Sequence, residues 1–426
     1  MKTQTEKEKE SKNPSNRRAL SVLFLSVFID LLGFGIIIPV LPYWNDTLGG
    51  TDFTYSVILS IYSLMQFIFA PIWGRISDKR GRRPIILTGI SGSIISFFLL
   101  SFTNSVAMLI IARALQGAFT AATLPTAQAF ISDTTTGEER AKGFGLIGAA
   151  FGLGLAIGPG IGGGLFTLTK HYSTLAYFAS GMSVLNLISA FIFLPETLKC
   201  KKEKDCDQEV ISSSRKDSFK FIFQNKEVLA IILTFSILIL AFATYTATLL
   251  PYGIARFGLS EENSSIVLLI VGLISVITQG IILRFLTKKF SNSTLMIVGF
   301  LIIATGVIVF SQVNSLIFMI FVSGPIAIGS SIGNPTNQAL LSQKTPMDKQ
   351  GGILGINQGL AALMRVIAPL LGMALLDVNL GLPYYFSATL LVCVTIFFVV
   401  FVKRRKPAQI EKKEVEAVIT ITEQMD

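Results

Sequence analysis

The stretch of sequence that decides the fold is Gly74-Arg75-Ile76-Ser77-Asp78-Lys79-Arg80-Gly81-Arg82-Arg83-Pro84. It places five cations, one carboxylate and two glycines between two long apolar runs. Because charged side chains are costly inside a bilayer, the stretch predicts a tight loop that joins two membrane helices. A loop with this many charges is useful where two helices must be held together and then released.

The composition also indicates a membrane protein. Of the 426 residues, 51% are hydrophobic and 15% are charged, whereas a soluble domain carries about 25% charged residues. A bilayer core needs roughly 20 apolar residues per helix. Twelve such windows predict an all-α protein, at about residues 20–43, 55–74, 84–103, 105–130, 142–168, 174–195, 227–251, 264–286, 293–311, 315–341, 351–376 and 383–402.

The formal net charge of +10 would suit a nucleic-acid partner if the cations shared one soluble face. They lie instead in alternate connections between the windows, and the connections between these hold almost no Lys or Arg. The positive-inside rule therefore predicts a multi-pass protein of the cell membrane with both termini in the cytoplasm. We expect the lipid bilayer as a partner, and no nucleic acid.

A charged segment at residues 199–226 divides the chain into two predicted six-helix bundles, 19–198 and 227–403, with cytoplasmic tails at 1–18 and 404–426. An internal duplication supports this division. A shift of 210 residues brings one set of polar residues and prolines onto another: Ser105, Pro125, Thr126, Gln128, Ser132 and Pro159 fall on Ser315, Pro335, Thr336, Gln338, Ser342 and Pro369. Such coincidences at one constant shift are far less expected than coincidences of apolar residues.

The charged stretch has a counterpart in the second half. A shift of 206 residues places Gly74 on Gly280 and Asp78 on Arg284, and brings the pair Arg82-Arg83 onto Lys288-Lys289. The second copy keeps the cations and loses the carboxylate. A gate built on Asp78 should therefore belong to the first half alone.

The sequence favours a transporter over an enzyme. Parallel six-helix repeats around a midplane site are the expected build of a rocker-type transporter. We find no Ser, His and Asp set, no metal-ligand cluster and no phosphate-binding loop of the GxxxxGK[ST] type. We therefore expect no catalytic residues, metal or cofactor. The energy must come from a gradient, for which we expect protons, or transport is passive.

Three ionisable residues lie well inside the apolar windows: Asp30 midway along the first, Arg113 in the inner part of the fourth and Arg365 midway along the eleventh. Each costs roughly 3 kcal/mol on insertion scales, which makes it a functional candidate. Asp30 could hold a proton in dry surroundings and release it to water or beside a cation. Arg113 stays charged and could bias a neighbouring acid. The alternative is that Asp30 pairs with Arg113 or with a helix backbone and only fixes packing.

Other residues of the windows suggest a deformable cavity lining. Gly33, Gly35, Pro39 and Pro42 should loosen the first helix beside Asp30, although a kink without function is equally possible. Ten small or kinking residues between Gly145 and Gly164 make a smooth stripe on the fifth helix, for sliding or for static packing. Seven polar side chains, together with Arg365, are candidates for the substrate cavity, with bonding between helices as the alternative: Gln66, Gln116, Gln128, Asn334, Asn337, Asn357 and Gln358.

Several motifs together resemble the major facilitator superfamily, in its twelve-helix drug:proton antiporter branch, and most closely the tetracycline efflux proteins. The motifs are Asp30 with the run 39–42, the segment 62–66 followed by Ala70-Pro71 and the charged loop, Arg113 with Gln116 and Gly117, and the run 151–163 with Gly154, Gly158, Pro159 and Gly162. The last run resembles the antiporter motif of that family. The resemblance covers nearly all of the first half and weakens in the second.

This resemblance implies alternating access, with a conformational gate made of Gly74, Asp78, Arg82, Arg83 and Asp133. We expect Asp133 to be the partner of Arg82, and the start of the eleventh helix, near Gln350 and Gly351, to receive Asp78. A carboxylate facing a helix N-terminus gains roughly 0.3 to 1 kcal/mol, enough to bias a near-balanced switch.

The leading hypothesis is a proton-coupled exporter of small amphipathic compounds, functional as a monomer. Tetracycline-like compounds are candidates, but the eighth to tenth windows lack the acids that tetracycline efflux proteins carry in their second half, so the substrate stays open. One alternative is an uptake carrier for a sugar or another small solute. The other is a membrane receptor of the same fold that transports nothing.

Overall fold

The computed structural model describes residues 14–135, 137–197, 220–346 and 349–400, and within these ranges its regular structure is helical. Eleven helices are long and apolar enough to cross a membrane, and a shorter apolar helix spans Leu382–Phe398. The predicted all-α membrane fold is therefore confirmed. Residues 1–13, most of the predicted linker and the predicted C-terminal tail lie outside the described ranges, and the domain boundaries stay a prediction.

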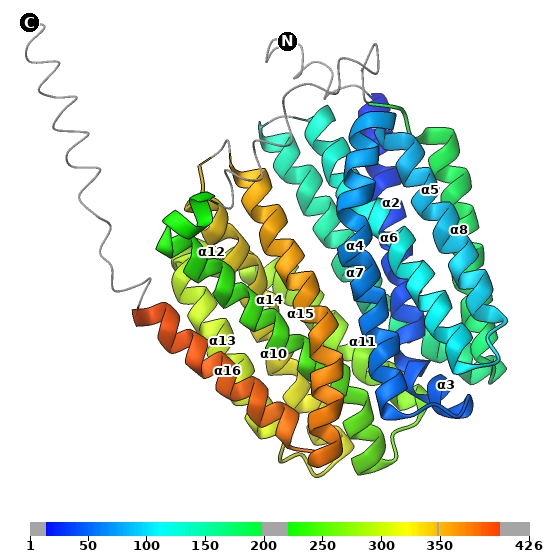
Figure 1. The fold of residues 1–426 in the computed structure, drawn as a ribbon, viewed down its shortest axis with the longest axis vertical. Helices are drawn as coiled ribbons and strands as arrows, with labels where there is room; N and C mark the ends of the chain where they lie inside the picture. The colour runs from blue at the N-terminus through cyan, green and yellow to red at the C-terminus, as the bar shows by residue number, and fades with distance from the viewer. Residues whose placement is uncertain (1–13, 136, 198–219, 347–348, 401–426) are drawn as a thin grey trace, which may run out of the picture.

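The helices form two groups that lie side by side in Figure 1. The first group contains α2 (Pro14–Ile37), α3 (Leu41–Thr47), α4 (Asp52–Arg80), α5 (Arg82–Ser101), α6 (Val106–Thr134), α7 (Gly137–Thr169) and α8 (Tyr172–Phe193). The second contains α10 (Lys226–Phe257), α11 (Glu261–Ile277), the π-helix Thr278–Ile282, α12 (Leu283–Lys289), α13 (Asn292–Phe310), α14 (Leu316–Gln343), α15 (Gln350–Val378) and α16 (Leu382–Phe398).

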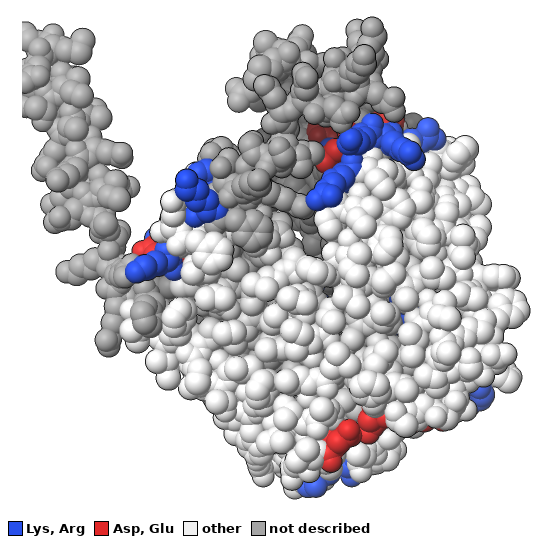
Figure 2. Space-filling model, in the orientation of Figure 1, with Lys and Arg blue, Asp and Glu red and all other residues white. Residues whose placement is uncertain are grey.

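The surface matches a protein embedded in lipid. Figure 2 shows flanks that are almost free of charge, with Lys and Arg gathered at the end where α4 meets α5. We call this the basic end, and the opposite one the far end. Large apolar side chains such as Leu168, Phe321 and Ile317 are more than three-quarters exposed, as expected of residues that face lipid rather than water.

The first membrane helix breaks where its prolines predict. Pro39 lies in a short 3₁₀ turn at Ile38–Val40 between α2 and α3, and Pro42 is an early residue of α3. Proline has no N–H to donate, so the regular ladder cannot continue through these positions. Gly33 and Gly35 stay within α2. Gly35 instead allows a neighbouring helix to approach closely.

The duplication is visible in the helix starts. Ser105 caps α6 through a bond from the N–H of Met108 to its side chain. Ser315 caps α14 in the same way, through the N–H of Phe318. Both helices contain a proline at the equivalent place, Pro125 and Pro335. The shift of 210 residues thus aligns the N-termini of two helices, α6 and α14, as the sequence predicted.

The predicted loop at 74–84 is much shorter than we expected. α4 continues through the charged residues to Arg80, and α5 begins at Arg82, so Gly81 alone separates the two helices. Arg and Lys are good helix formers, and beyond the apolar core water solvates their charges. Gly81 has a φ of 107°, a conformation that favours glycine. The structure thus has the predicted tight connection between two helices, but this connection is Gly81 alone, and the charged residues belong to the helices themselves.

The small residues of α7 pack against two different helices, α2 and α11. A Cβ on Gly154 would lie 2.9 Å from the carbonyl oxygen of Phe28, and one on Gly158 would lie 2.8 Å from the Cα of Gly35. These motif glycines, with Gly162, pack α7 closely against α2 of the same half. A second face, which includes Gly152 and Gly160, meets α11 of the other half. The motif glycines thus form a static packing surface against α2 in this conformation.

Gly158→Val and Gly164→Val are a matched pair of variants that tests the close packing of α7 on α2. The first adds side-chain atoms against the backbone of α2, whereas a Cβ on Gly164 meets nothing within 4 Å. We expect Gly158→Val to destabilise the protein by about 1–3 kcal/mol, the usual cost of overpacking. Gly164→Val should melt close to the unmodified protein. Thermal unfolding of the purified protein in detergent measures both, and equal melting temperatures would contradict the close contact.

Candidate functional site

Two seams join the halves of the protein. In the first, α7 packs antiparallel on α11: Gly160 lies against Leu269, Ala156 against Gly272 and Gly152 against Val276. In the second, α4 packs antiparallel on α15. There the Ser60 hydroxyl donates to the carbonyl of Val366 over 2.7 Å, and Phe67 lies near Gly359.

Both seams separate toward the basic end. On α7, Gly148 and Gly145 lie four and seven residues before Gly152, on the same face, yet a Cβ on either would meet nothing within 4 Å. The same holds for Gly74 on α4 and Gly355 on α15. Figure 1 shows α4 and α15 diverging in this direction. The structure is therefore closed at the far end and open at the basic end.

Polar bonds between the halves cluster at the far end. Lys170, at the end of α7, forms an ion pair with Glu262 of α11. The Tyr172 hydroxyl donates to Glu261 over 2.9 Å, and the Tyr43 hydroxyl donates to the carbonyl of Leu259 over 2.6 Å. We call these three contacts the far-end latch. Sequence reasoning missed it, because its members lie at helix ends and in the short turns beside them, and their pairing depends on how the two halves dock.

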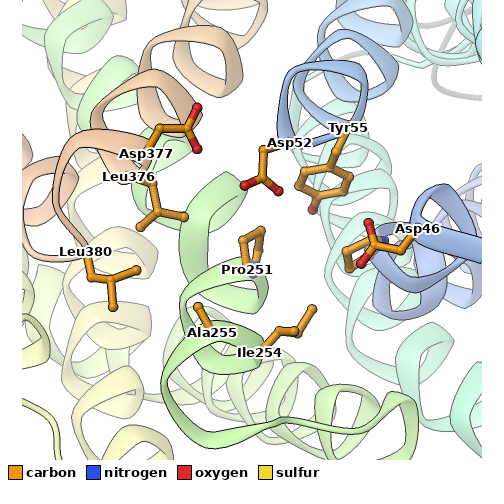
Figure 3. A pocket seen from close by; sticks show the side chains of 10 residues that line it. Asp46, Asp52, Tyr55, Pro251, Ile254, Ala255, Leu376, Asp377 and Leu380 are labelled. Atoms are coloured by element: carbon orange, nitrogen blue, oxygen red, sulfur yellow. The ribbon is translucent and has the colours of Figure 1, made fainter. Parts of the chain in front are cut away.

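A cavity of about 340 Å³ lies beside the latch. Its carboxylates come from three elements: Asp46 from α3, Asp52 from α4 and Asp377 from α15. Figure 3 shows Asp52 and Asp377 projecting into the same space from opposite halves. Like charges this close disfavour each other when both are ionised. When both are ionised they oppose the latch, and closure of this end is then a balance of opposing contacts.

Three of the five predicted gate residues, Asp78, Arg82 and Asp133, meet at the basic end within the first half, whereas the Arg83 side chain donates to the carbonyl of Phe191 and Gly74 faces open space. Arg82 forms an ion pair with Asp78, and its Nε donates to Asp133 over 2.9 Å. The partnership of Arg82 with Asp133 is as we expected. The Arg82 side chain is 9% exposed, against 40% for Asp78. This trio ties together the ends of α4, α5 and α6.

No described contact joins Asp78 to the start of α15, where we expected its recipient. Gln350 donates instead to the carbonyl of Ser342 in its own half. The helix N-terminus that does hold a carboxylate is that of α5. There Glu196, from the segment after α8, accepts from the N–H groups of Arg82 and Arg83 over 3.0 and 3.2 Å. An acid beside a helix start that has no side-chain cap is stabilising.

In the middle of the first half, Arg113 is fully buried beside a stacked pair of aromatic rings. Its guanidinium lies 5.2 Å from the ring centroid of Phe34 and 5.0 Å from that of Tyr62. Its Nη1 donates to Gln116 over 2.8 Å. Its Nε and Nη2 have no hydrogen-bond partner. Cation–π contacts therefore replace the carboxylate that a buried arginine would otherwise need.

Asp30 is buried in α2 and forms no ion pair. The hydroxyls of Ser93 on α5 and Thr123 on α6 are its nearest polar neighbours, but neither of its carboxyl oxygens is hydrogen-bonded. Pairing with Arg113, the packing alternative for Asp30, is therefore not seen among the described residues. A buried carboxyl that no cation holds can exist as the neutral acid.

Arg365 lies on α15, one residue from Val366, whose carbonyl bonds across the seam. It is half-buried and close enough to Tyr62 for an electrostatic contact. The Tyr62 hydroxyl accepts from Gln66 over 3.0 Å and from Thr120 over 3.3 Å. The structure thus brings Arg113, Gln66 and Arg365 around one tyrosine, which sequence reasoning had not selected.

The remaining cavity candidates are dispersed. Gln358 donates to Gln338, which donates to Asn334, in a chain between α15 and α14. Asn337 is buried and bonds Ile231 and Met296 inside its own half, so it follows the alternative of bonding between helices. Asn357 is buried with both side-chain atoms unpartnered. Gln128 is exposed.

These features define a class of protein. Two bundles of membrane helices meet along two seams, close at one end and carry isolated charges at mid-depth, and this is the build of a secondary transporter. The chain belongs to the Major Facilitator Superfamily, whose family model matches residues 23–326 and 280–423.

Curated relatives of similar length support this assignment. The chain is 30% identical over 388 residues to the tetracycline resistance protein, class C, of Escherichia coli, covering 89% of this chain and 96% of the relative. It is 29% identical over 374 residues to multidrug resistance protein 1 of Bacillus subtilis (strain 168), covering 87% and 93%. The resemblance to tetracycline efflux proteins that the motifs predicted is confirmed.

Solved structures agree on the fold. The human organic anion transporter MFSD10 (TETRAN) superposes with a TM-score of 0.68 at 20% identity, over 90% of this chain and 99% of that one. A bacterial homologue of the human lysosomal transporter Spinster gives a TM-score of 0.72 at 14% identity, over 93% and 100%.

Charge reversal tests the far-end latch. Lys170→Glu places like charges at the end of the seam, and we expect it to open the far end more often. The pair is largely exposed, so the effect should be about 1 kcal/mol, or roughly fivefold. The measurement is the labelling rate of a single cysteine introduced as Ser265→Cys, a buried position on the seam, after the native cysteines are replaced. Lys170→Glu with Glu262→Lys should restore slow labelling. If both variants label at the original rate, the ion pair does not hold the seam.

Asp78→Asn tests the basic-end trio. It removes one of the two carboxylates that pair with Arg82 and leaves the other, Asp133, in place. We expect the transport rate to fall about tenfold, as suits the loss of a charge-assisted hydrogen bond, while the ligand Kd changes little. Asp78→Glu, which keeps the charge, is the control. An unchanged rate in Asp78→Asn would show that the trio has no part in gating.

Proposed function

We propose that this protein is a secondary active transporter that exports small amphipathic compounds by alternating access, in exchange for protons. The names of its relatives support the direction and the class of compound, because several are tetracycline or multidrug resistance proteins. The motifs that the chain shares with them lie in α2, α4, α6 and α7, around the centre of the first half.

The single observation that carries the proton-coupled part is the environment of Asp30. Its carboxyl group is buried in the membrane region beside two hydroxyls, and none of the described ion pairs includes it. A permanently charged carboxylate would be costly there, but a carboxyl that gains and loses a proton as its surroundings dry and hydrate is not. Asp30 is the proposed proton carrier, and Arg113 its charged neighbour across α6.

The two seams supply the alternating access. With the basic end in the cytoplasm, as the positive-inside rule predicts, the structure is open to the cytoplasm and closed to the outside. In the opposite state the latch would break and the open stretches of α7 and α4 would close on α11 and α15. The antiparallel register of α4 on α15 would then bring Asp78 near the start of α15.

Asp30→Asn tests the coupling. In proteoliposomes with an imposed pH gradient, we expect gradient-driven export of tetracycline-like and dye-like compounds to be lost. Binding should survive, because Asn keeps the size and polarity of the side chain. As a control, Asn186→Asp is added to the Asp30→Asn variant. It places a buried acid on α8 and should not rescue export. Coupled transport that persists in Asp30→Asn would remove the proton role from this residue.

The same liposomes separate the rival functions. Export accompanied by proton uptake supports the proposal. Entry of a sugar or another solute would indicate an uptake carrier, and no movement of any compound would indicate a receptor.

A further inference from the structure

The two arginines of the central region are not balanced by acids. Arg113 belongs to the first half and Arg365 to the second, and none of the described ion pairs includes either of them. Asp30 is the only described carboxylate at this depth; it lies beside Ser93 and Thr123 and is close enough to Tyr62 for an electrostatic contact, so one carboxyl group stands against two guanidinium groups. The other acids whose side chains the structure describes lie at the ends of helices or in the segments beyond them: Asp46, Asp52, Asp78, Asp133, Glu196, Glu227, Glu261, Glu262 and Asp377. The centre therefore carries an excess of positive charge.

Unused hydrogen-bond donors accompany this charge. Two guanidinium nitrogens of Arg113 and the amide nitrogen of Gln116 are buried without a partner. Buried donors of this kind normally have an acceptor, and a buried charge normally has a counter-charge. No described side chain supplies either. A bound ligand that carries an anionic oxygen could supply both.

The surroundings favour an aromatic body on that ligand. Phe34 and Tyr62 stack with their ring centroids 4.7 Å apart, and Tyr62 lies between the two arginines. The rings present apolar surface from α2 and α4 beside polar donors, the usual make-up of a small-molecule site. Arg365, on α15 of the other half, lies close enough to Tyr62 for an electrostatic contact, within the stretch where α4 and α15 are still packed together.

We propose that the transported compounds carry an anionic oxygen group on a planar apolar body, and that Arg365 and Arg113 bind this group from the two halves. The inference rests on the proposed transport function and names its substrate class. A guanidinium binds a carboxylate or an enolate through parallel N–H bonds, which a neutral or cationic compound cannot match. Because one arginine comes from each half, an anion bound between them would also favour their approach.

Three naphthalene compounds of nearly equal shape test the proposal: 2-naphthoate, 2-naphthamide and 2-naphthylmethylamine. The measurement is calorimetric binding to the full-length protein in detergent. We expect the carboxylate to bind at least about tenfold more tightly than the amide, and the amine most weakly. Equal binding of the three would overturn the proposal, and this comparison needs no variant. Displacement of the carboxylate by chloride at similar concentration would also overturn it, in favour of an inorganic-ion site.

Arg365→Gln tests whether Arg365 causes the preference for the carboxylate over the amide. It should reduce binding of the carboxylate to the level of the amide and leave the amide unchanged, whereas Arg365→Lys should keep part of the preference. Arg256→Gln, at the far end of α10, is the control and should change nothing. A preference that survives in Arg365→Gln contradicts the assignment. Gradient-driven export of the amine without any charge preference would overturn the anion site alone, and anion selectivity without gradient-driven export would overturn only the proposed function.

Discussion

The structure depends on one constraint: the hydrocarbon of a bilayer offers no water to a charge. Charged side chains are therefore sorted to the two ends of the helices, where they hold helices or halves together. The three that stay at mid-depth, Asp30, Arg113 and Arg365, must be compensated by the protein or by something it binds. The aromatic rings beside Arg113 and the hydroxyls beside Asp30 compensate these charges only in part. What makes these three residues expensive also makes them suited to bind and release protons or solutes.

The halves are free to move because few directional bonds cross between them. Along α7 and α11 the seam consists of small side chains and methyl groups, such as Ala156 against Gly272, which can separate without leaving buried donors unpaired. Within the first half, by contrast, the backbone of α2 lies directly on Gly158. One face of the same helix is thus locked and the other is labile. Packing alone decides which parts move as rigid bodies.

The fold could be predicted from the sequence because hydrophobic length, charge placement and the Ser105–Ser315 repeat are local signals. The pairing of Arg82 with Asp133 followed from family resemblance. The one-residue turn at Gly81 was missed because charged residues at a membrane surface extend a helix as readily as they end it. The roles of Glu196 and of the latch at Lys170 were missed for a different reason, since they depend on which distant segments dock. Tyr62 carried no signal as a site residue, because an aromatic ring in a membrane helix usually faces lipid or core.

The two ends of the protein differ in kind, and this bears on how it can switch. The basic-end trio joins α4, α5 and α6 of one half, and its second-half counterpart has Arg284 in place of a carboxylate. The far-end latch joins the halves themselves, against the repulsion of Asp52 and Asp377. Breaking the latch therefore frees the halves while the trio keeps α4 aligned with its own bundle. Since α4 also carries Tyr62 and contacts α15, a rotation of α4 as part of a rigid half would open the far end and reshape the central site in one movement.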